Sequence, residues 1–207
     1  MAETQPKLLI ENDGAVRTLR LNRPESLNAL DDDLLKALGR AVADADKDKT
    51  VRCIVVTGAG RGFCSGQDLA AVAARYTTNK PIELGSHLRD YYNPIITRLH
   101  TIEKPVIASV NGVAAGAGCS IALACDIRIA AESASFIEAF VNIGLAPDAG
   151  STFMLPRLIG VARAMEMAIT GRKVTAAEAV QIGLVNQVVP DDQLAAATKK
   201  LADKLAG

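Results

Sequence analysis

The fold class follows from residues 51–69, which read VRCIVVTGAGRGFCSGQDL. An apolar run of strand length, Val51 to Thr57, passes directly into a glycine-rich turn, and a helical pattern follows from Asp68 to Tyr76. Near-continuous apolar runs of this length are typical of strands that are buried on both faces. The same order recurs at residues 106–125, where an apolar run meets the glycine turn Asn111 to Gly118 and then an apolar helix. Strand, glycine turn and helix in repeated succession predict an α/β protein.

The remaining residues supply further strands and helices for such a fold. Asn12 to Gly14 predicts a turn between two short strands. Apolar residues at helical spacing from Asp31 to Asp46 predict a helix that Asp31 caps, and Thr175 to Glu178 is a capping box that opens a short helix. Further expected strands are 127–130, 135–140 and 184–189, further expected helices are 95–99, 156–170 and 191 to the end, and 77–85 is an expected loop.

Composition limits the classes of protein that the chain can represent. It has 207 residues, of which 49% are apolar, and 23 basic residues balance 23 acidic ones, so that the formal net charge is zero. Binding to nucleic acid or to an anionic membrane needs a positive field, which this balance does not provide. No apolar run approaches the ~20 residues of a membrane span, and the amino terminus lacks a secretory leader pattern. The length of the chain favours one compact domain.

The cysteines and histidines do not show the spacing of a metal site. The four cysteines lie in apolar or glycine-rich runs without a C-x-x-C pair, and the chain has only two histidines. Such cysteines are typical of reduced thiols in the cytoplasm. We therefore expect a cytoplasmic protein without a metal site, in which Cys64 is a small buried residue.

The first glycine turn does not fit the common phosphate-binding or nucleophile motifs. The G-x-G-x-x-G fingerprint ends on Phe63 when it starts at Gly58, and on Ser65 when it starts at Gly60. No Gly-Lys-Ser/Thr follows for a Walker A loop, and a G-x-S-x-G elbow needs its serine one place before Ser65. Helices that open on glycine turns present unpaired N–H groups. Two such turns facing one another would form an oxyanion hole from the main chain alone, whereas the simpler interpretation is that the glycines only permit tight turns.

The two turns, in this order, resemble the crotonase (enoyl-CoA hydratase/isomerase) superfamily. The likeness rests on residues 62–69, GFCSGQDL, and 111–118, NGVAAGAG. Further matches in order along the chain are residues 22–24 with 28–30, 124–127, 143–147, 156–160 and 177–185. The resemblance covers nearly the whole chain, and it implies one core domain over residues 1–190 and the start of a C-terminal helical region at 191–207 that looks truncated. It implies a spiral of ββα units with surrounding helices, which binds an acyl-CoA thioester as a homotrimer or hexamer, with coenzyme A as part of the substrate and no separate cofactor.

The resemblance also implies which residues form the site. Two main-chain N–H groups stabilise a thioester enolate in this family, and they correspond here to Gln67 and Ala117. The residues implied in binding the thioester and coenzyme A are Ser26, Leu27, Ala29, Ser65, Gly66, Asp68, Leu69 and Gly116. Asp68 is also expected to cap the helix that it opens.

The acidic residues decide which reaction the resemblance implies. Hydratases of this family add water with two glutamates, and the corresponding positions here hold Ser120 and Phe140, neither of which can act as a carboxylate base. Asp148 lies where some relatives, among them ring-epoxide isomerases of phenylacetyl-CoA degradation, carry a catalytic aspartate. One carboxylate suffices to take a proton from a substrate and return it, whereas water addition benefits from an acid and a base held together. The sequence therefore favours an isomerase in which Asp148 is catalytic.

Several alternatives stay open at this point. Asp148 could be only a turn residue or the N-cap of a helix starting at Ser151, and Glu138 could be the catalytic acid in its place. The protein could be a hydratase that uses these atypical acids, or a non-catalytic member that binds acyl-CoA.

Overall fold

The computed structural model describes residues 5–70 and 84–207, in which the strands form two sheets. The larger sheet has the order β1 (Leu8–Asp13), β2 (Val16–Leu21), β3 (Cys53–Gly58), β5 (Val106–Val110), β7 (Ile127–Ala131) and β10 (Gln187–Val189). The smaller sheet has the order β4 (Gly62–Cys64), β6 (Val113–Ala115), β8 (Ser135–Ile137) and β9 (Lys173–Thr175). The outer pairs β1–β2 and β8–β9 are antiparallel, and the other pairs are parallel.

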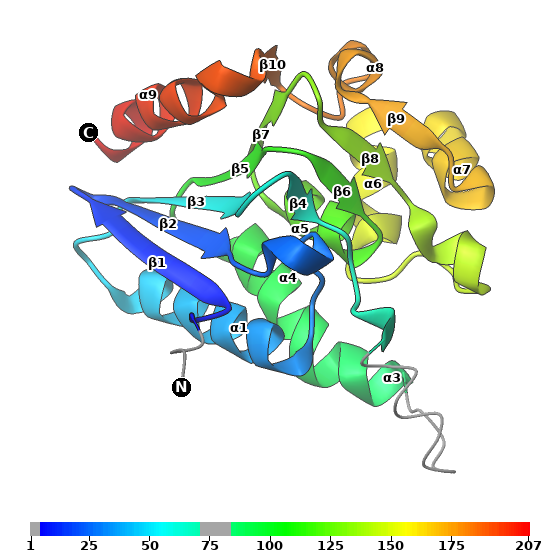
Figure 1. Cartoon of the computed structure of the whole chain (residues 1–207), viewed down its shortest axis with the longest axis horizontal. Coiled ribbons are helices and arrows are strands. Elements are labelled where there is room, and N and C mark those ends of the chain that lie inside the picture. Colours follow the sequence, from blue (N-terminus) through cyan, green and yellow to red (C-terminus); the bar gives the residue numbers. More distant parts are fainter. Residues whose placement is uncertain (1–4, 71–83) are drawn as a thin grey trace.

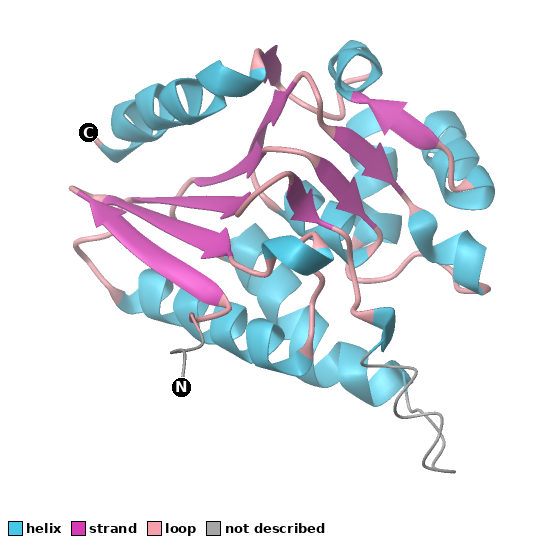
Figure 2. Ribbon diagram, viewed as in Figure 1, coloured by secondary structure: helices cyan, strands magenta, loops and turns pink. Residues whose placement is uncertain are grey.

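The helices lie around these sheets (Figures 1 and 2). The α-helices are α1 (Asp32–Lys47), α3 (Leu84–His87), α4 (Asn93–Thr101), α5 (Ala117–Ala124), α6 (Ser151–Ile159), α7 (Val161–Thr170), α8 (Ala176–Gln181) and α9 (Leu194–Ala206). Short 3-10 turns are η1 (Pro24–Ser26), η3 (Ala139–Ile143) and η4 (Asp191–Gln193), and η2 (Leu88–Tyr92) is a π-helical turn.

The chain alternates between the two sheets. β3 leads into β4, β5 into β6 and β7 into β8, so that each of these three strands of the larger sheet is followed by one of the smaller sheet and then by a helix or helical turn. After β4, Leu69 and Ala70 are helical, and the rest of the helix expected as far as Tyr76 falls outside the described residues. This repetition confirms the expected α/β spiral of ββα units.

Two hydrophobic layers hold the helices on opposite faces of the larger sheet. On β3, Ile54 and Val56 pack into the main core with α1, α4 and α5, whereas Cys53 and Val55 pack toward α9. This division follows from the alternation of side chains along a strand. Three further expected features are present. They are the pair of strands from Leu8 to Leu21 with its tight turn, the helix capped by Asp31, and the C-terminal helix.

Several expected elements differ in the structure. The two glycine turns each contain a short strand, β4 and β6, because residues 62–64 and 113–115 pair with each other. The single helix expected over 156–170 is two helices, since Gly160 adopts φ +79° between α6 and α7. The strand expected over 135–140 ends at Ile137 and the one expected over 184–189 is confined to 187–189, while β9 was not expected.

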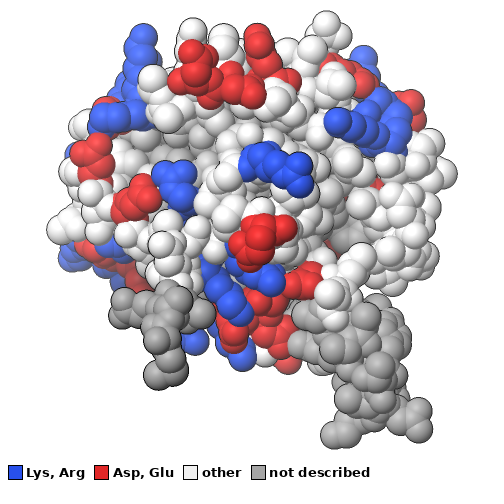
Figure 3. Space-filling model, viewed as in Figure 1, with Lys and Arg blue, Asp and Glu red and all other residues white. Residues whose placement is uncertain are grey.

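The loop expected over 77–85 lies mostly outside the described residues, and its last two residues, Leu84 and Gly85, begin α3. Within the described residues, no helix combines the length and apolar character needed to cross a bilayer. Basic and acidic side chains are interspersed over the face shown in Figure 3, in keeping with the zero net charge.

Candidate active site

The two glycine turns are in direct contact. Gly66 adopts φ +93°, and a Cβ atom at this position would lie 2.8 Å from the carbonyl oxygen of Ala115 and 3.5 Å from the amide nitrogen of Ala117. Gly118 in the first turn of α5 lies against the carbonyl of Cys64 with no room for a Cβ atom. Glycine is therefore required at both positions, by backbone conformation and close approach at Gly66 and by close approach at Gly118. These contacts place the residue after Gly66 beside the amino terminus of α5.

The amide of Gln67 points away from its strand partner. The N–H of Leu30 donates to the carbonyl of Gly66 at 2.7 Å, and the carbonyl of Leu30 accepts from Asp68 N–H at 3.0 Å. Because successive residues of an extended strand direct their main-chain groups to opposite sides, the N–H of the intervening Gln67 faces the other way. Ala117 is the first residue of α5, where an amide has no acceptor within the helix. Neither amide donates to an acceptor in residues 5–70 or 84–207.

Two neighbouring unpaired amides can hold an oxygen that gains negative charge. Donors of this kind are fixed before the reaction and act in a site from which water is largely excluded. The positive end of α5 adds to their effect at Ala117. The geometry thus fits the predicted roles of Gln67 and Ala117.

The side chain of Gln67 is fixed by three groups. Its Nε2 donates to the carbonyl of Leu30 at 3.0 Å, and its Oε1 accepts from the hydroxyl of Tyr92 at 2.5 Å. His87 Nε2 lies 3.3 Å from the same Oε1. Tyr92 is 3% exposed and ends the π-helical turn η2. The sequence analysis did not identify Tyr92, because no motif marks it and a π-turn is not visible in a helical pattern.

The segment from Arg23 to Leu30 packs along the first glycine turn. The Ser65 N–H donates to the carbonyl of Leu27 at 2.9 Å, and the Ser65 hydroxyl donates to the carbonyl of Ser26 at 3.0 Å. Leu27 adopts φ 52°, a left-handed conformation. The structure therefore brings Ser26, Leu27, Ala29 and Ser65 together beside Gly66, as the resemblance implies.

Asn28 joins these two segments and was not among the predicted site residues. It is fully buried, and its Nδ2 donates to the carbonyls of Ala59 and Gly62 at 2.9 and 2.8 Å. Its Oδ1 accepts from the N–H of Arg23 at 2.8 Å. Its side chain thus takes the place of main-chain pairing between two irregular segments. The matched motif at residues 28–30 contained Asn28, but only the structure shows that its side chain is enclosed.

The other three predicted binding residues lie at the two glycine turns; they are Asp68, Leu69 and Gly116. The Oδ1 of Asp68 accepts from the N–H of Ala70 at 3.1 Å, which confirms its expected capping role, and its Oδ2 is paired with Arg23 at 2.9 Å. Leu69 is 52% exposed next to these groups. Gly116 adopts φ +51° and is the N-cap of α5.

Asp148 lies in a tight turn directly before α6. The turn uses two left-handed residues, Ala149 at φ 46° and Gly150 at φ 85°. Gly150 is the N-cap of α6 and no side chain caps that helix, so the interpretation of Asp148 as an N-cap is wrong. Its main-chain carbonyl does close the turn, by accepting from the N–H of Ser151 at 3.0 Å. The half-buried carboxyl has its pKa raised by burial from 3.8 to about 6.

Asp148 is connected to both candidate amides. Ser120, in the same helix as Ala117, has its hydroxyl 3.3 Å from the main-chain oxygen of Asp148. Tyr92, which bonds to Gln67, lies close enough to Asp148 for the charge of the carboxylate to help raise its pKa, although burial is the larger cause. These contacts hold the turn of Asp148 against the helix of Ala117 and bring its titratable carboxyl near Tyr92.

The positions that carry glutamates in hydratases are occupied by buried residues that cannot replace them. Ser120 is 1% exposed and Phe140 is 6% exposed. Glu138, the alternative acid, is fully buried after β8, where its Oε1 lies 3.1 Å from the hydroxyl oxygen of Ser151. Burial raises its pKa from 4.5 to about 7, and the charge of Asp148 adds to this rise. Cys64 is fully buried with its pKa raised to about 12, as expected of an inert thiol.

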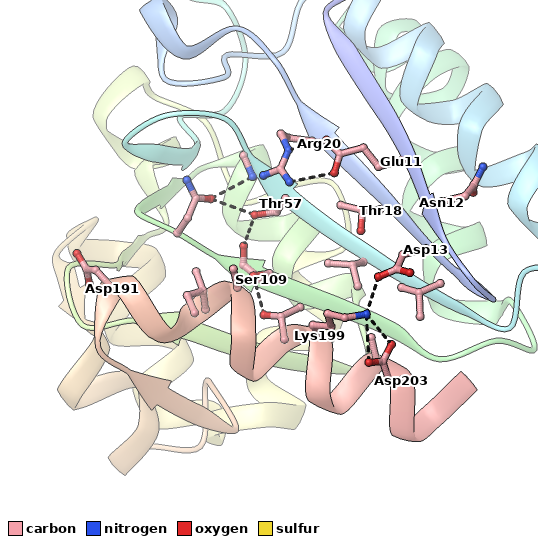
Figure 4. A pocket seen from close by; sticks show the side chains of 18 of the residues that line it. Glu11, Asn12, Asp13, Thr18, Arg20, Thr57, Ser109, Asp191, Lys199 and Asp203 are labelled. Atoms are coloured by element: carbon pink, nitrogen blue, oxygen red, sulfur yellow. Dashed lines mark hydrogen bonds and ion pairs between the residues drawn. The ribbon is translucent and has the colours of Figure 1, made fainter. Parts of the chain in front are cut away.

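A separate cleft of about 560 Å³ lies between the larger sheet and α9 (Figure 4). None of the predicted site residues lines it. Figure 4 shows Arg20 paired with Glu11, and Lys199 between Asp13 and Asp203. The basic side chains of the cleft are thus paired with acidic side chains of the same cleft. The cleft is not the candidate active site.

Comparison with known proteins agrees with this architecture. The profile of the family described as enoyl-CoA hydratase/isomerase matches residues 11–207. The chain is 48% identical over 191 residues to 1,2-epoxyphenylacetyl-CoA isomerase of Escherichia coli (strain K12), an alignment that covers 92% of this chain and 72% of that protein. It is also 48% identical over 177 residues to a probable enoyl-CoA hydratase of Rhodobacter capsulatus, covering 84% of this chain and 65% of that protein. The crystal structure of a putative enoyl-CoA hydratase/isomerase from Mycobacterium abscessus superposes with a TM-score of 0.92 at 39% identity, covering 97% of this chain and 77% of that one.

Proposed function

Because the chain belongs to the enoyl-CoA hydratase/isomerase family, we propose that it is an acyl-CoA isomerase with Asp148 as its single acid–base group. The observation that carries the proposal is the position of this carboxyl. The main-chain oxygen of Asp148 lies 3.3 Å from the hydroxyl of Ser120 in the helix of Ala117, and the charge of its carboxyl acts on Tyr92, which holds Gln67. No carboxylate stands at residues 120 and 140.

In the proposed reaction, Asp148 removes a proton from the substrate and returns it to another carbon of the same substrate. The Asp148 carboxylate takes a proton from C2 of a 3-enoyl-CoA, and the electron pair of that C–H bond moves toward the thioester, whose oxygen becomes negative. The amides of Gln67 and Ala117 hold this oxygen. The carboxyl then returns the proton to C4, which yields the 2-enoyl-CoA and restores the carboxylate. Rearrangement of a ring-epoxide acyl-CoA would use the same three groups, and the Escherichia coli relative is named for that chemistry.

The pKa of Asp148 suits this task. A base that must also act as an acid works best when its pKa lies near the working pH. A carboxyl with a pKa of about 6 is mostly ionised at neutral pH and is still a stronger base than an exposed aspartate. The proposal requires no cofactor beyond the coenzyme A of the substrate.

A hydratase is the second candidate, because two carboxyls with raised pKa values, Asp148 and Glu138, lie near each other and several relatives are named as hydratases. Glu138 is fully buried, however, which does not suit a residue that must meet a water molecule next to the substrate. This observation favours the isomerase.

The test is a direct comparison of substrates. Purified protein is given 3-hexenoyl-CoA, crotonyl-CoA and a ring-epoxide of phenylacetyl-CoA, and products are followed by chromatography. Isomerisation of the first or third with little hydration of the second supports the proposal. Faster hydration of crotonyl-CoA would favour the hydratase, and binding of all three without turnover would favour a non-catalytic member.

The oligomer and the location are part of the same proposal. Val161, Met165 and Ile169 follow each other at four-residue spacing on α7 and are 68%, 52% and 62% exposed. Such an apolar stripe is typical of a surface that another subunit covers, which supports a homotrimer or hexamer. Four free, buried cysteines support a cytoplasmic location. Light scattering coupled to size-exclusion chromatography measures the oligomeric state.

A further inference from the structure

Glu138 is a buried acid that the proposed reaction does not use. It lies at the carboxyl end of β8, is 0% exposed, and has one oxygen, Oε2, that is buried without a hydrogen-bond partner in the described part of the chain. Leaving an ionised carboxylate oxygen unpaired in the protein interior is strongly unfavourable, whereas a neutral carboxyl carries a much smaller penalty. The unpaired oxygen therefore favours the protonated form of Glu138.

Three short contacts lead from Glu138 to the main chain of Asp148. The distance from Glu138 Oε1 to Ser151 Oγ is 3.1 Å, and the distance from Ser151 Oγ to Ser120 Oγ is 2.8 Å. Ser120 Oγ then lies 3.3 Å from the main-chain oxygen of Asp148 and at the same distance from that of Gly116, so that one hydroxyl proton of Ser120 can serve both acceptors. Both serines are 1% exposed, so that water does not compete for these contacts.

The number of protons available to these three contacts indicates the protonation state of Glu138. Each of the three contacts joins two oxygens and needs one proton between them, but the two serines supply only two. A proton on Glu138 provides the third. In that state Glu138 donates to Ser151, Ser151 to Ser120, and Ser120 to the carbonyl of Asp148. When Glu138 is ionised, Ser151 must turn its proton to the carboxylate and Ser120 must turn toward Ser151, so that the carbonyl of Asp148 loses this donor.

We infer that Glu138 is a positioning residue, which holds the turn of Asp148 as a neutral acid through Ser151 and Ser120. The turn needs support, because Ala149 adopts a left-handed conformation that is unfavourable for a residue with a side chain. Ionisation of Glu138 withdraws that support and also places a second negative charge near the Asp148 carboxylate. The inference rests on the proposed function in that Asp148 is taken as the acid–base group.

The groups that face Glu138 do not include a compensating cation in the described residues. From α5, the neutral thiol of Cys119 faces it, and from α6 the hydroxyl of Ser151. From the preceding turn, Asp148 adds a negative charge. Arg128 on β7 acts on Cys119 and is engaged with the carbonyls of Cys125 and Leu184. Burial thus dominates, and the pKa of Glu138 rises to about 7, so that ionisation falls in a range accessible to assay.

The decisive variant is Glu138→Gln, whose amide can donate to Ser151 but cannot ionise. We expect the wild-type kcat to rise as Asp148 ionises and to fall again above a pH of about 7 as Glu138 ionises. The variant should keep kcat within about threefold at neutral pH and lose the alkaline decline. Ser120→Ala should lower kcat while leaving KM nearly unchanged, and should also remove the alkaline decline. Glu132→Gln changes an exposed glutamate six residues away and is the matched control, with an unchanged pH profile.

Infrared spectroscopy tests the same inference without turnover. The wild-type protein should show the stretch of a protonated buried carboxyl that disappears as the pH rises through about 7, and Glu138→Gln should lack it. An alkaline decline that persists in Glu138→Gln, or absence of the protonated band in wild type at a pH of about 6, overturns the inference. Should the variant not fold, the band of Asp148→Asn decides, because that variant lacks the Asp148 carboxyl, which also titrates at a pH of about 6; absence of the band there overturns the inference. A protein without isomerase activity that still shows the band would contradict the proposed function and leave the neutral state of Glu138 supported.

Discussion

Replacing Asp148 by asparagine separates function from stability more clearly than any other change. Asparagine keeps the shape of the side chain but cannot accept a proton. Positioned acid–base groups contribute about 10²–10⁴-fold to the rate, so we expect Asp148→Asn to lower kcat by a factor in that range. Binding of a substrate-like CoA ester should change by less than about threefold, because the main-chain amides remain.

The same variant should be more stable than the wild type at neutral pH. Burial raises the pKa of Asp148 from 3.8 to about 6, so that the folded protein holds this proton more tightly than the unfolded chain does. The resulting destabilisation is absent below a pH of about 4, grows as the pH rises to about 6, and is complete above that value. Two pKa units correspond to ~3 kcal/mol, and solvent screening of this half-buried group reduces the figure to about 1–2 kcal/mol. Asparagine removes this contribution.

Calorimetry and kinetics together test this reasoning. A gain of about 1–2 kcal/mol raises Tm by roughly 2–8 °C for a chain of this size. We expect this increase at a pH of about 7.5, and little difference between variant and wild type at a pH of about 4. An asparagine variant that retains wild-type turnover, or that is less stable than wild type at both pH values, would refute the assignment of Asp148 as a buried catalytic carboxyl.

Three further variants test the frame of the site. Gly66→Ala should lower the unfolding free energy by about 2–3 kcal/mol and abolish turnover, since it combines the strain of a positive φ with a main-chain overlap. The control Gly14→Ala also changes a glycine of positive φ but has open space around it, and should lose only about 1 kcal/mol by calorimetry. Asn28→Ala removes three buried hydrogen bonds and should lose about 3 kcal/mol in urea unfolding, so a loss below about 1 kcal/mol would contradict its joining role. Tyr92→Phe should lower kcat about three- to tenfold with KM nearly unchanged in steady-state assays, because Gln67 loses its hydroxyl partner; an unchanged kcat would show that this contact does not position the amide.

Much of the architecture follows from local sequence patterns. The near-continuous apolar runs at 51–57 and 106–110 predict buried strands because few polar side chains interrupt them, and their strands β3 and β5 pair in the larger sheet. The short strands β4 and β6 could not be predicted in this way. Their residues read as glycine turns, and they are strands only because the two turns pair with each other across about 50 residues of sequence.

The site was predictable where it depends on the main chain and less so where it depends on side-chain packing. Contact of the two glycine turns follows from the resemblance, and the structure places Gly66 against Ala115 and Ala117. The partners of Gln67 and Asp148 come from distant elements, however, and no local pattern contains them. Asp148 illustrates the difference, because its sequence context equally suggested an N-cap, and only the conformation of Ala149 and Gly150 moves it out of that position.

The amides assigned to the thioester oxygen belong to the main chain, and this has a consequence for inheritance. A nucleotide change in the codon for residue 67 or 117 alters a side chain but leaves the N–H group in place. The codon for residue 148 alone determines whether the turn before α6 presents a carboxylate. Under the proposed function, one missense mutation at residue 148 would therefore remove the acid–base group while both amides stay in place, provided that Gly66 and Gly118 are retained.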